Sequence, residues 1–272
     1  MSHSAIVVIS WWSNCLGLDC LHRLAQYTPD RELIVVQVGK SPEQKQRFRE
    51  HLPPHVSELF YPDHAPGEHS RVIQNIALHQ MPAASGIWFI DHDVFIHEDC
   101  QPWLVESDSI FSQRDLCLGL HAAPVNSPAI TQPAFWLSPA RWPPSLPSFD
   151  AIPFEPQASA RRPDLFRHTG AMHMPLKDTL VEARDILASS GRVARFALAG
   201  AQLDLPTFPK HAHLGGLFLF AGPLLPPEFE NWMKATVAQF TRFYAACSPA
   251  WLEIEDPELM RRLAEFQGAL HV

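Results

Sequence analysis

The sequence lacks an excess of basic residues, regularly spaced cysteines and any long apolar run, and each absence excludes a class of protein. Among its 272 residues, Lys and Arg number 21 and Asp and Glu 29, so the formal net charge is −8. Broad binding to nucleic acid needs a basic face, which this balance argues against. We therefore expect no nucleic-acid partner, although a local basic pocket is still allowed.

The cysteines are odd in number and scattered, and no two form a C-x-x-C pair. This spacing predicts neither a zinc site nor a disulfide framework. Reduced and mostly buried thiols are the ordinary interpretation, and they fit the cytoplasmic location that we expect. The five are Cys15, Cys20, Cys100, Cys117 and Cys247.

No segment has the length of a membrane span, which needs about 20 apolar residues. The most apolar later stretch, residues 214–225, is short and is interrupted by three glycines and Pro223. Residues 5–9 follow no basic region and precede no cleavage pattern, so we interpret them as a strand and not as a signal peptide. We expect no transmembrane segment.

Strand-like and helix-like patterns alternate along the first hundred residues. Apolar runs at 5–10, 32–38, 57–61 and 86–90 predict buried strands, and helical spacing recurs between them. Strands separated by helices predict βαβ units. We therefore expect an α/β fold with a mostly parallel, Rossmann-like sheet flanked by helices. Further helices are predicted at 16–26, 70–80, 175–190, 228–247 and 257–270, and from the capping box that starts at Ser41.

The chain has 26 prolines, and ten of them fall within residues 124–163. Prolines at this density are excluded from helix interiors and central strands. Aromatic residues are interleaved with them, so we predict an ordered, irregular loop region here.

The triplet Asp91-His92-Asp93 directly follows the apolar run at 86–90. In an extended backbone Asp91 and Asp93 would project to the same side. At the carboxyl end of a parallel strand they would face the ligand crevice. Two hard carboxylates suit Mn²⁺ or Mg²⁺. A solvated surface turn is the alternative.

A second candidate motif is His211-Ala212-His213, followed by Gly215 and Gly216. A neutral imidazole can complete a divalent site, and glycines let the backbone approach a ligand closely. Either histidine could serve, and a surface turn is again the alternative.

Four segments together resemble the successive signatures of nucleotide-sugar-dependent glycosyltransferases of the GT-A fold, closest to family 2. They are residues 5–14, 32–39, 67–77 and 86–99, and a looser similarity extends to about residue 220. Asn14 matches the family's Asn-bearing loop after the first strand. Asn75 matches its Arg-Asn pair, although Gln74 stands where Arg is usual.

The resemblance implies a GT-A-like catalytic domain over residues 1–222, with a donor half at about 1–100 and an acceptor half at about 101–222. Residues 223–272 would form a helical extension packed on the same domain, which leaves a homodimer open. The implied enzyme is a metal-dependent, hexosyltransferase-type glycosyltransferase. It would use a UDP- or GDP-sugar and an acceptor that is a glycan, lipid, peptide or small metabolite.

The resemblance also implies roles for individual residues. Mn²⁺ or Mg²⁺ would be held by Asp91, Asp93 and His213. An inverting reaction needs a carboxylate base, for which Asp150, Glu155 and Asp164 are the candidates; a retaining reaction would not need one. The residues expected to contact the donor are Ser10, Trp11, Asn14, Gln37, Arg71, Asn75, Asp91 and His92.

Gln37 departs from the family's usual acidic residue, and the usual Glu-Asp base motif is not found. An inactive nucleotide-sugar-binding relative therefore stays open as an alternative. A nucleotidyltransferase also stays open, although it would favour a Gly- and Arg/Lys-rich first loop. A metal-dependent hydrolase is a third alternative, but this sequence has no H-E-x-x-H motif of the kind that such enzymes carry.

Overall fold

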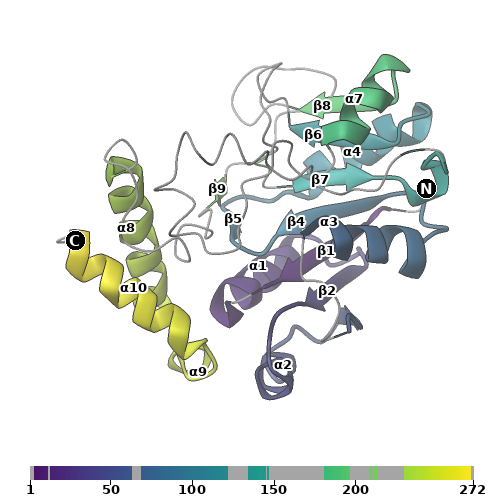
Figure 1. The fold of residues 1–272 in the computed structure, drawn as a ribbon. Coiled ribbons are helices and arrows are strands. Elements are labelled where there is room, and N and C mark those ends of the chain that lie inside the picture. The colour runs from purple at the N-terminus through teal and green to yellow at the C-terminus, as the bar shows by residue number, and fades with distance from the viewer. Residues whose placement is uncertain are drawn as a thin grey trace.

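The computed structural model describes residues 3–11, 13–62, 69–121, 134–144, 146, 181–196, 209, 211–213 and 230–270. This part of the chain is built on a seven-stranded sheet with the strand order β3-β2-β1-β4-β7-β6-β8 (Figure 1). Its strands are β1 (Ala5–Ser10), β2 (Leu33–Gln37), β3 (Val56–Leu59), β4 (Ile87–Asp91), β6 (Leu118–His121), β7 (Ala134–Leu137) and β8 (Val193–Phe196).

A second, two-stranded sheet pairs β5 (Val94–Ile96) with β9 (His211–His213). The described helices of the sheet domain are α1 (Asn14–Tyr27), α2 (Pro42–Arg49), α3 (His69–Gln74), the π-helix η1 (Asn75–Gln80), α4 (Gln101–Gln113), the 3-10 helix η2 (Pro139–Arg141) and α7 (Val181–Ser189). The C-terminal helices are α8 (Glu230–Ala246), α9 (Pro249–Leu252) and α10 (Pro257–Leu270).

The large sheet is mostly parallel, as expected. β1 pairs in parallel with β2 and β4, β2 with β3, and β6 with β8. β7 is antiparallel to both of its neighbours, β4 and β6. The predicted α/β class, with helices flanking a mostly parallel sheet and further helices at the C-terminus, is confirmed.

Alternate side chains of each central strand enter two separate cores. Ile6, Val8 and Trp88 pack on one face with apolar residues of α1 and α4. Val7 and Phe89 pack on the other face with apolar residues of α3, η1 and α7. Because both faces of β1 and β4 are covered, these strands are apolar throughout, which is the pattern that made them recognisable.

Local capping signals agree with several predicted boundaries. The Ser41 side chain accepts from the backbone of Gln44, and the Gln44 side chain accepts from the backbone of Ser41, so the predicted capping box is present. Gly191, just beyond α7, has a φ of 69°, a left-handed conformation that suits a glycine ending a helix.

One expectation about local structure is wrong. The proline-rich region is not irregular throughout, because residues 134–137 form the central strand β7. That four-residue run contains no proline, so its backbone N–H groups can join the sheet ladder. The predicted helix at 70–80 is present, as an α-helix to Gln74 and as a π-helix from Asn75.

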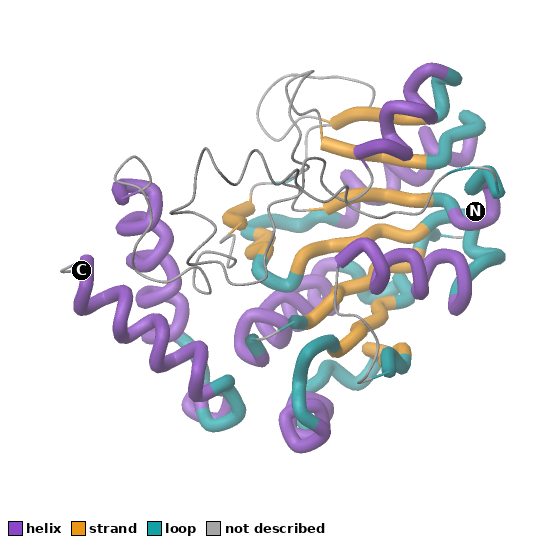
Figure 2. The backbone as a smooth tube through the Cα atoms, in the orientation of Figure 1, coloured by secondary structure: helices purple, strands orange, loops and turns teal. Residues whose placement is uncertain are grey.

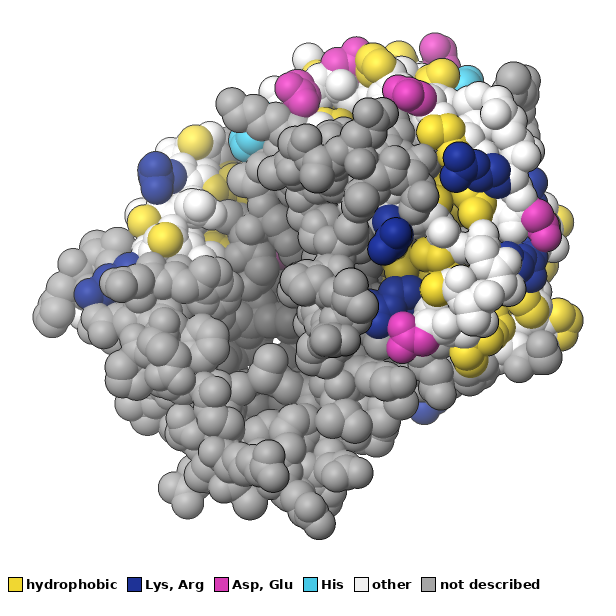
Figure 3. Space-filling view, turned by 90° about the horizontal axis from the view of Figure 1, so that it is seen from above, with side chains coloured by type: hydrophobic (Ala, Val, Ile, Leu, Met, Phe, Trp, Pro, Cys, Tyr) yellow, Lys and Arg dark blue, Asp and Glu magenta, His cyan; other side chains and the backbone are white. Residues whose placement is uncertain are grey.

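A third core joins the C-terminal helices to the sheet domain. Cys15 and Leu16, at the start of α1, pack with Phe240 of α8 and Phe266 of α10. Figure 2 shows α8 and α10 side by side, beyond the end of the sheet where β5 and β9 lie. Among the described residues, no helix is long and apolar enough to span a bilayer. Side chains of both charges are interspersed with apolar ones on the coloured part of the face seen in Figure 3.

Gly86 supplies the first test of the packing. A Cβ at this position would lie 2.4 Å from Trp136 Nε1 and 2.5 Å from Ser4 Oγ, two atoms that are hydrogen-bonded to each other. We predict that Gly86→Ala lowers the free energy of unfolding by about 1–3 kcal/mol, because the buried indole must move. Guanidinium denaturation measures this change.

Gly268→Ala is the matched control, since nothing lies within 4 Å of the added Cβ. Gly268 is in α10, so alanine there should raise the free energy of unfolding by up to about 1 kcal/mol. Equal effects of the two substitutions would contradict the packing described at Gly86.

Candidate functional site

The carboxyl ends of three neighbouring parallel strands meet at one edge of the sheet. Ser10 at the end of β1 is in register with Gln37 of β2, and Ile9 is in register with Asp91 of β4. The chain passes from β1 to β2 on one side and later to β4 on the other side. Ligands of open α/β sheets bind at such a point, where the loops after adjacent strands diverge.

The acidic pair lies at this edge, but in a turn and not in an extended strand. Asp91 ends β4, His92 and Asp93 form the turn, and β5 begins at Val94. The expectation that a side-chain period of two aligns the carboxylates is therefore wrong. His92 and Asp93 are buried, with Asp93 only 5% exposed, and Asp91 is half-buried. Burial of a carboxylate requires compensating charge or hydrogen bonds.

Helix α1 contacts this turn through Cys20, whose Sγ donates to the Asp91 carbonyl oxygen at 3.6 Å. Burial raises the pKa of the Cys20 thiol, and the negative charges of Asp19, Asp93 and Asp91 raise it further. The protonated thiol acts as a hydrogen-bond donor to the turn.

Strand β9 brings the second predicted motif to the same place. Its antiparallel register sets His213 opposite Val94 and His211 opposite Ile96. The backbone of His213 is therefore beside the residue that follows Asp93, although the two are far apart in sequence. This register favours His213 over His211 as the partner of the acidic turn. The residues form a strand and not the surface turn considered as the alternative.

Two carboxylates and an imidazole are a ligand set that Mn²⁺ or Mg²⁺ accepts. The burial of Asp93 and the register of His213 fit such an ion. Among the side chains that the structure describes, no group of three His, Cys, Asp or Glu residues is close enough to hold a metal. The ligand set of Asp91, Asp93 and His213 stays a prediction.

A buried lysine that sequence reasoning missed lies beside the end of β1. Lys40 Nζ donates to Ser10 Oγ at 2.8 Å and lies 4.1 Å from the centroid of the Phe48 ring. Lys40 is 6% exposed, and burial lowers its pKa to about 7. The negative charge of Glu255 is the largest influence that raises the pKa of Lys40, ahead of Cys15 and Glu58.

Gly17 of α1 makes room for this arrangement. A Cβ on Gly17 would lie 2.3 Å from Ser10 Oγ and 3.2 Å from Phe48 Cε2. Only a glycine lets α1 approach the serine that receives the Lys40 hydrogen bond. No sequence pattern marks Lys40, because its environment is made by β1, α1 and α2 together.

Glu255, also missed, occupies the N-terminus of α1. Its Oε1 accepts from the Asn14 backbone N–H at 2.8 Å, and its Oε2 accepts from the Cys15 backbone N–H at 3.0 Å. Oε2 also accepts from Ser13 Oγ at 2.7 Å and Tyr244 Oη at 3.1 Å. The positive end of the helix dipole favours a carboxylate here. Glu255 thus ties the C-terminal segment to the first loop of the sheet.

Three of the side chains that were predicted to contact the nucleotide-sugar donor form hydrogen bonds with other groups of the protein. Asn14 Nδ2 donates to the Ile254 carbonyl oxygen at 2.5 Å. Gln37 Nε2 donates to Glu58 Oε1 at 3.0 Å, and Asn75 Oδ1 accepts from Gln80 Nε2 at 2.7 Å.

Trp11 is half-buried against the core beneath α3, and Arg71 is exposed on α3. The predicted base candidates, Asp150, Glu155 and Asp164, lie outside the described residues. The donor-contact and base roles therefore stay predictions.

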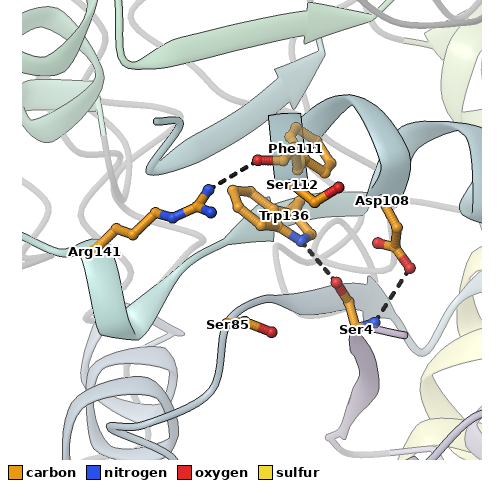
Figure 4. Close-up of a pocket in the computed structure, with 7 residues that line it drawn as sticks. All are labelled: Ser4, Ser85, Asp108, Phe111, Ser112, Trp136 and Arg141. Carbon is orange, nitrogen blue, oxygen red and sulfur yellow. Dashed lines mark hydrogen bonds between the residues drawn. The ribbon is translucent and has the colours of Figure 1, made fainter. Parts of the chain in front are cut away.

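A cavity of about 220 Å³ lies at the opposite edge of the sheet, beside the amino ends of β1 and β4. Figure 4 shows Ser4 between Trp136 and Asp108, with the Arg141 guanidinium directed at the Phe111 carbonyl. The Ser4 N–H donates to Asp108 Oδ2 at 3.2 Å, and Arg141 Nη1 donates to the Phe111 oxygen at 2.8 Å. These polar groups are engaged with one another, so we assign no ligand to this cavity.

Known proteins offer similarities of fold. No protein-family model matches the chain, and no curated protein matches its sequence. It is similar to a candidate nucleotide-diphospho-sugar transferase from Desulfovibrio desulfuricans G20, at TM-score 0.43 and 11% identity over 98% of this chain and 99% of that one.

It is also similar to the galactosyltransferase LgtC solved with donor and acceptor sugar analogues, at TM-score 0.44 and 11% identity over 84% of this chain and 99% of that one. A candidate glucose-1-phosphate thymidylyltransferase from Bacillus anthracis follows at TM-score 0.39 and 9% identity, over 73% and 88% of the two chains. Glycosyltransferases are among these structures, and the resemblance to family 2 stays a prediction. Likeness at this level transfers no activity, which must be inferred from this chain's own residues.

The buried Lys40 ammonium predicts a pH-dependent stability. Its pKa is about 7 in the folded chain and about 10.5 when unfolded. Between these values the unfolded chain binds more protons, so the Lys40 contribution makes stability rise with pH. Lys40→Met should therefore raise the free energy of unfolding by a few kcal/mol at pH 6, and this gain should shrink towards pH 9.5.

Urea denaturation at several pH values measures this effect, with Lys234→Met on the half-exposed face of α8 as the control. If the difference between wild type and Lys40→Met does not vary with pH, the folded pKa of Lys40 is not lowered.

Glu255 gives a second prediction. Glu255→Gln replaces one accepting oxygen by an amide NH₂, which would face buried donors. We expect the free energy of unfolding to fall by about 1–3 kcal/mol. The exposed Glu253, two residues away, provides the control: Glu253→Gln should change stability by less than about 0.5 kcal/mol. Equal thermal stability of the two variants would show that Glu255 does not hold the C-terminal segment.

Proposed function

We propose that this chain is a metal-dependent glycosyltransferase, which moves a sugar from a nucleoside-diphosphate donor to an acceptor. The single observation that carries the proposal is the acidic turn Asp91–Asp93 at the carboxyl end of β4, with His213 on the strand beside it. Hard oxygen ligands at the crevice of an α/β sheet are what a metal-bound diphosphate requires. The sequence resemblance to GT-A enzymes, which includes this turn, supports the same function.

Asp93, Asp91 and His213 would hold the Mn²⁺ or Mg²⁺ ion. When bound, such an ion supplies positive charge that stabilises the departing diphosphate. The neighbouring Cys20 thiol orients the turn through its hydrogen bond to the Asp91 carbonyl oxygen.

The donor would lie across the ends of β4 and β1. Arg71, exposed on α3, is suited to a charge-assisted hydrogen bond with a phosphate oxygen. Trp11 presents a half-buried indole after β1 on which a base can stack. His92 lies at the same edge, in the turn after β4. Ser10, Asn14, Gln37 and Asn75 take a lesser part in the proposal, because their described hydrogen bonds are internal.

In the transfer, the bond between the sugar's anomeric carbon and the diphosphate oxygen breaks, and the electron pair leaves with the diphosphate. A bond from the acceptor oxygen to the same carbon forms, and the acceptor's proton must be taken up. In an inverting reaction a carboxylate receives it, for which Asp150, Glu155 and Asp164 are the candidates.

Calorimetry with UDP and GDP, with and without Mn²⁺, tests the site. We expect one of the nucleotides to bind only when the metal is present. Asp93→Asn and His213→Ala should each weaken that binding by about 10- to 100-fold, as losses around metal sites do. Asp30→Asn, in an exposed turn, is the matched control and should leave binding unchanged.

Release of free UDP or GDP from a panel of nucleotide sugars then tests the reaction. Metal-dependent binding without turnover, with every plausible acceptor, would indicate an inactive binding protein. Pyrophosphate release from a nucleoside triphosphate and a sugar phosphate would indicate a nucleotidyltransferase. Binding that survives both Asp93→Asn and His213→Ala would show that the metal assignment is wrong.

A further inference from the structure

Two of the five cysteines meet where the C-terminal helices join α1. Cys15 and Cys247 pack in the same apolar cluster, although they lie near opposite ends of the chain. Cys15 Sγ donates to the carbonyl oxygen of Trp251, in α9, at 3.3 Å. Ser13 Oγ lies 3.1 Å from the hydroxyl oxygen of Tyr244, in the last turn of α8. The start of α1 therefore contacts the chain on both sides of Cys247.

The two thiols contact each other and differ in their access to solvent. A side-chain hydrogen bond with Cys247 is the largest cause that raises the pKa of Cys15, followed by burial and the charge of Glu255. Cys247 is half-buried, whereas the other four cysteines are buried. Among the described hydrogen bonds, those of Cys20 and Cys117 go to backbone carbonyl oxygens and not to a second cysteine. Cys15 and Cys247 are thus a pair of thiols with one member open to a reagent.

We infer that Cys15 and Cys247 are a reversible modification site, which forms a disulfide when the chain meets a small-molecule disulfide such as oxidised glutathione. The two sulfurs must approach from contact to about 2 Å. Cys247 directly follows α8 and is half-buried, so its side chain has room for this movement. The bond would fasten the C-terminal helices to the N-terminus of α1 beside Glu255. It does not depend on the proposed function.

The exchange takes two steps. The Cys247 thiolate attacks one sulfur of glutathione disulfide, so that a bond between Cys247 and glutathione forms and one glutathione thiolate leaves. This step makes Cys247 neutral and removes its hydrogen bond, the largest cause of the raised Cys15 pKa. Cys15 then gives its proton to solvent, attacks the Cys247 sulfur and releases the second glutathione. Two thiols of the chain are oxidised, and one glutathione disulfide is reduced to two thiols.

The test treats the full chain with glutathione disulfide, quenches with acid and counts free thiols after denaturation. We expect the count to fall from five to three, with no glutathione retained. A digest under non-reducing conditions should contain one cross-linked peptide pair, joined at Cys15 and Cys247. The midpoint of thermal unfolding should rise by about 5–10 °C, because the closed loop spans most of the chain. Dithiothreitol should reverse each change.

Three variants assign the steps. Cys247→Ser should form no cross-link, and Cys15→Ser should stop with one glutathione retained on Cys247. Cys117→Ser is the matched control, because Cys117 donates to the Arg141 carbonyl oxygen at 3.0 Å and serine keeps that donor. Its cross-link should form as in wild type. Thermal unfolding confirms that each variant is folded, and the half-buried Cys247 position is the one at which serine is tolerated best.

The wild-type digest alone is enough to contradict the inference. It is overturned if all five thiols stay free, if glutathione is retained without a cross-link, or if another pair of cysteines is joined. A cross-link that lowers the unfolding midpoint would show that the thiols leave their native positions to react, and it would overturn the inference too. None of these outcomes changes the proposed function, since no nucleotide or sugar takes part in the test.

Discussion

Burial of β1 on both faces is the constraint on which the candidate site depends. All six residues of β1 are buried, with α1 and α4 covering one face and α3, η1 and α7 the other. Its two neighbours, β2 and β4, run parallel to it, so the loops after all three strands open at the same edge. Ser10, Lys40 and Asp91 are therefore neighbours because the core places β2, β1 and β4 side by side.

The C-terminal segment restricts what that edge can bind. In many α/β folds the N-terminus of the first helix is open to a ligand phosphate. Here the Glu255 carboxylate already takes the backbone donors of Asn14 and Cys15. An anionic ligand is thereby kept from α1. Asp91 and Asp93 lie at the same edge, at and after the end of β4, so under the proposed function the anion would be a diphosphate held there through a metal ion.

Features set by local pattern were predictable from sequence, and features set by tertiary contact were not. Doubly buried strands such as β1 are apolar runs, and the box at Ser41 caps α2 with residues three apart. β7 was hidden by the prolines around it, although its own four residues include none. The turn after Asp91 was mistaken for a continuing strand, because the apolar run gives no sign of where pairing ends.

Lys40 and Glu255 could not be predicted as buried from the sequence, because the burial of a charged side chain depends on which elements pack against it. Natural sequences break local rules of stability mainly at sites kept for function.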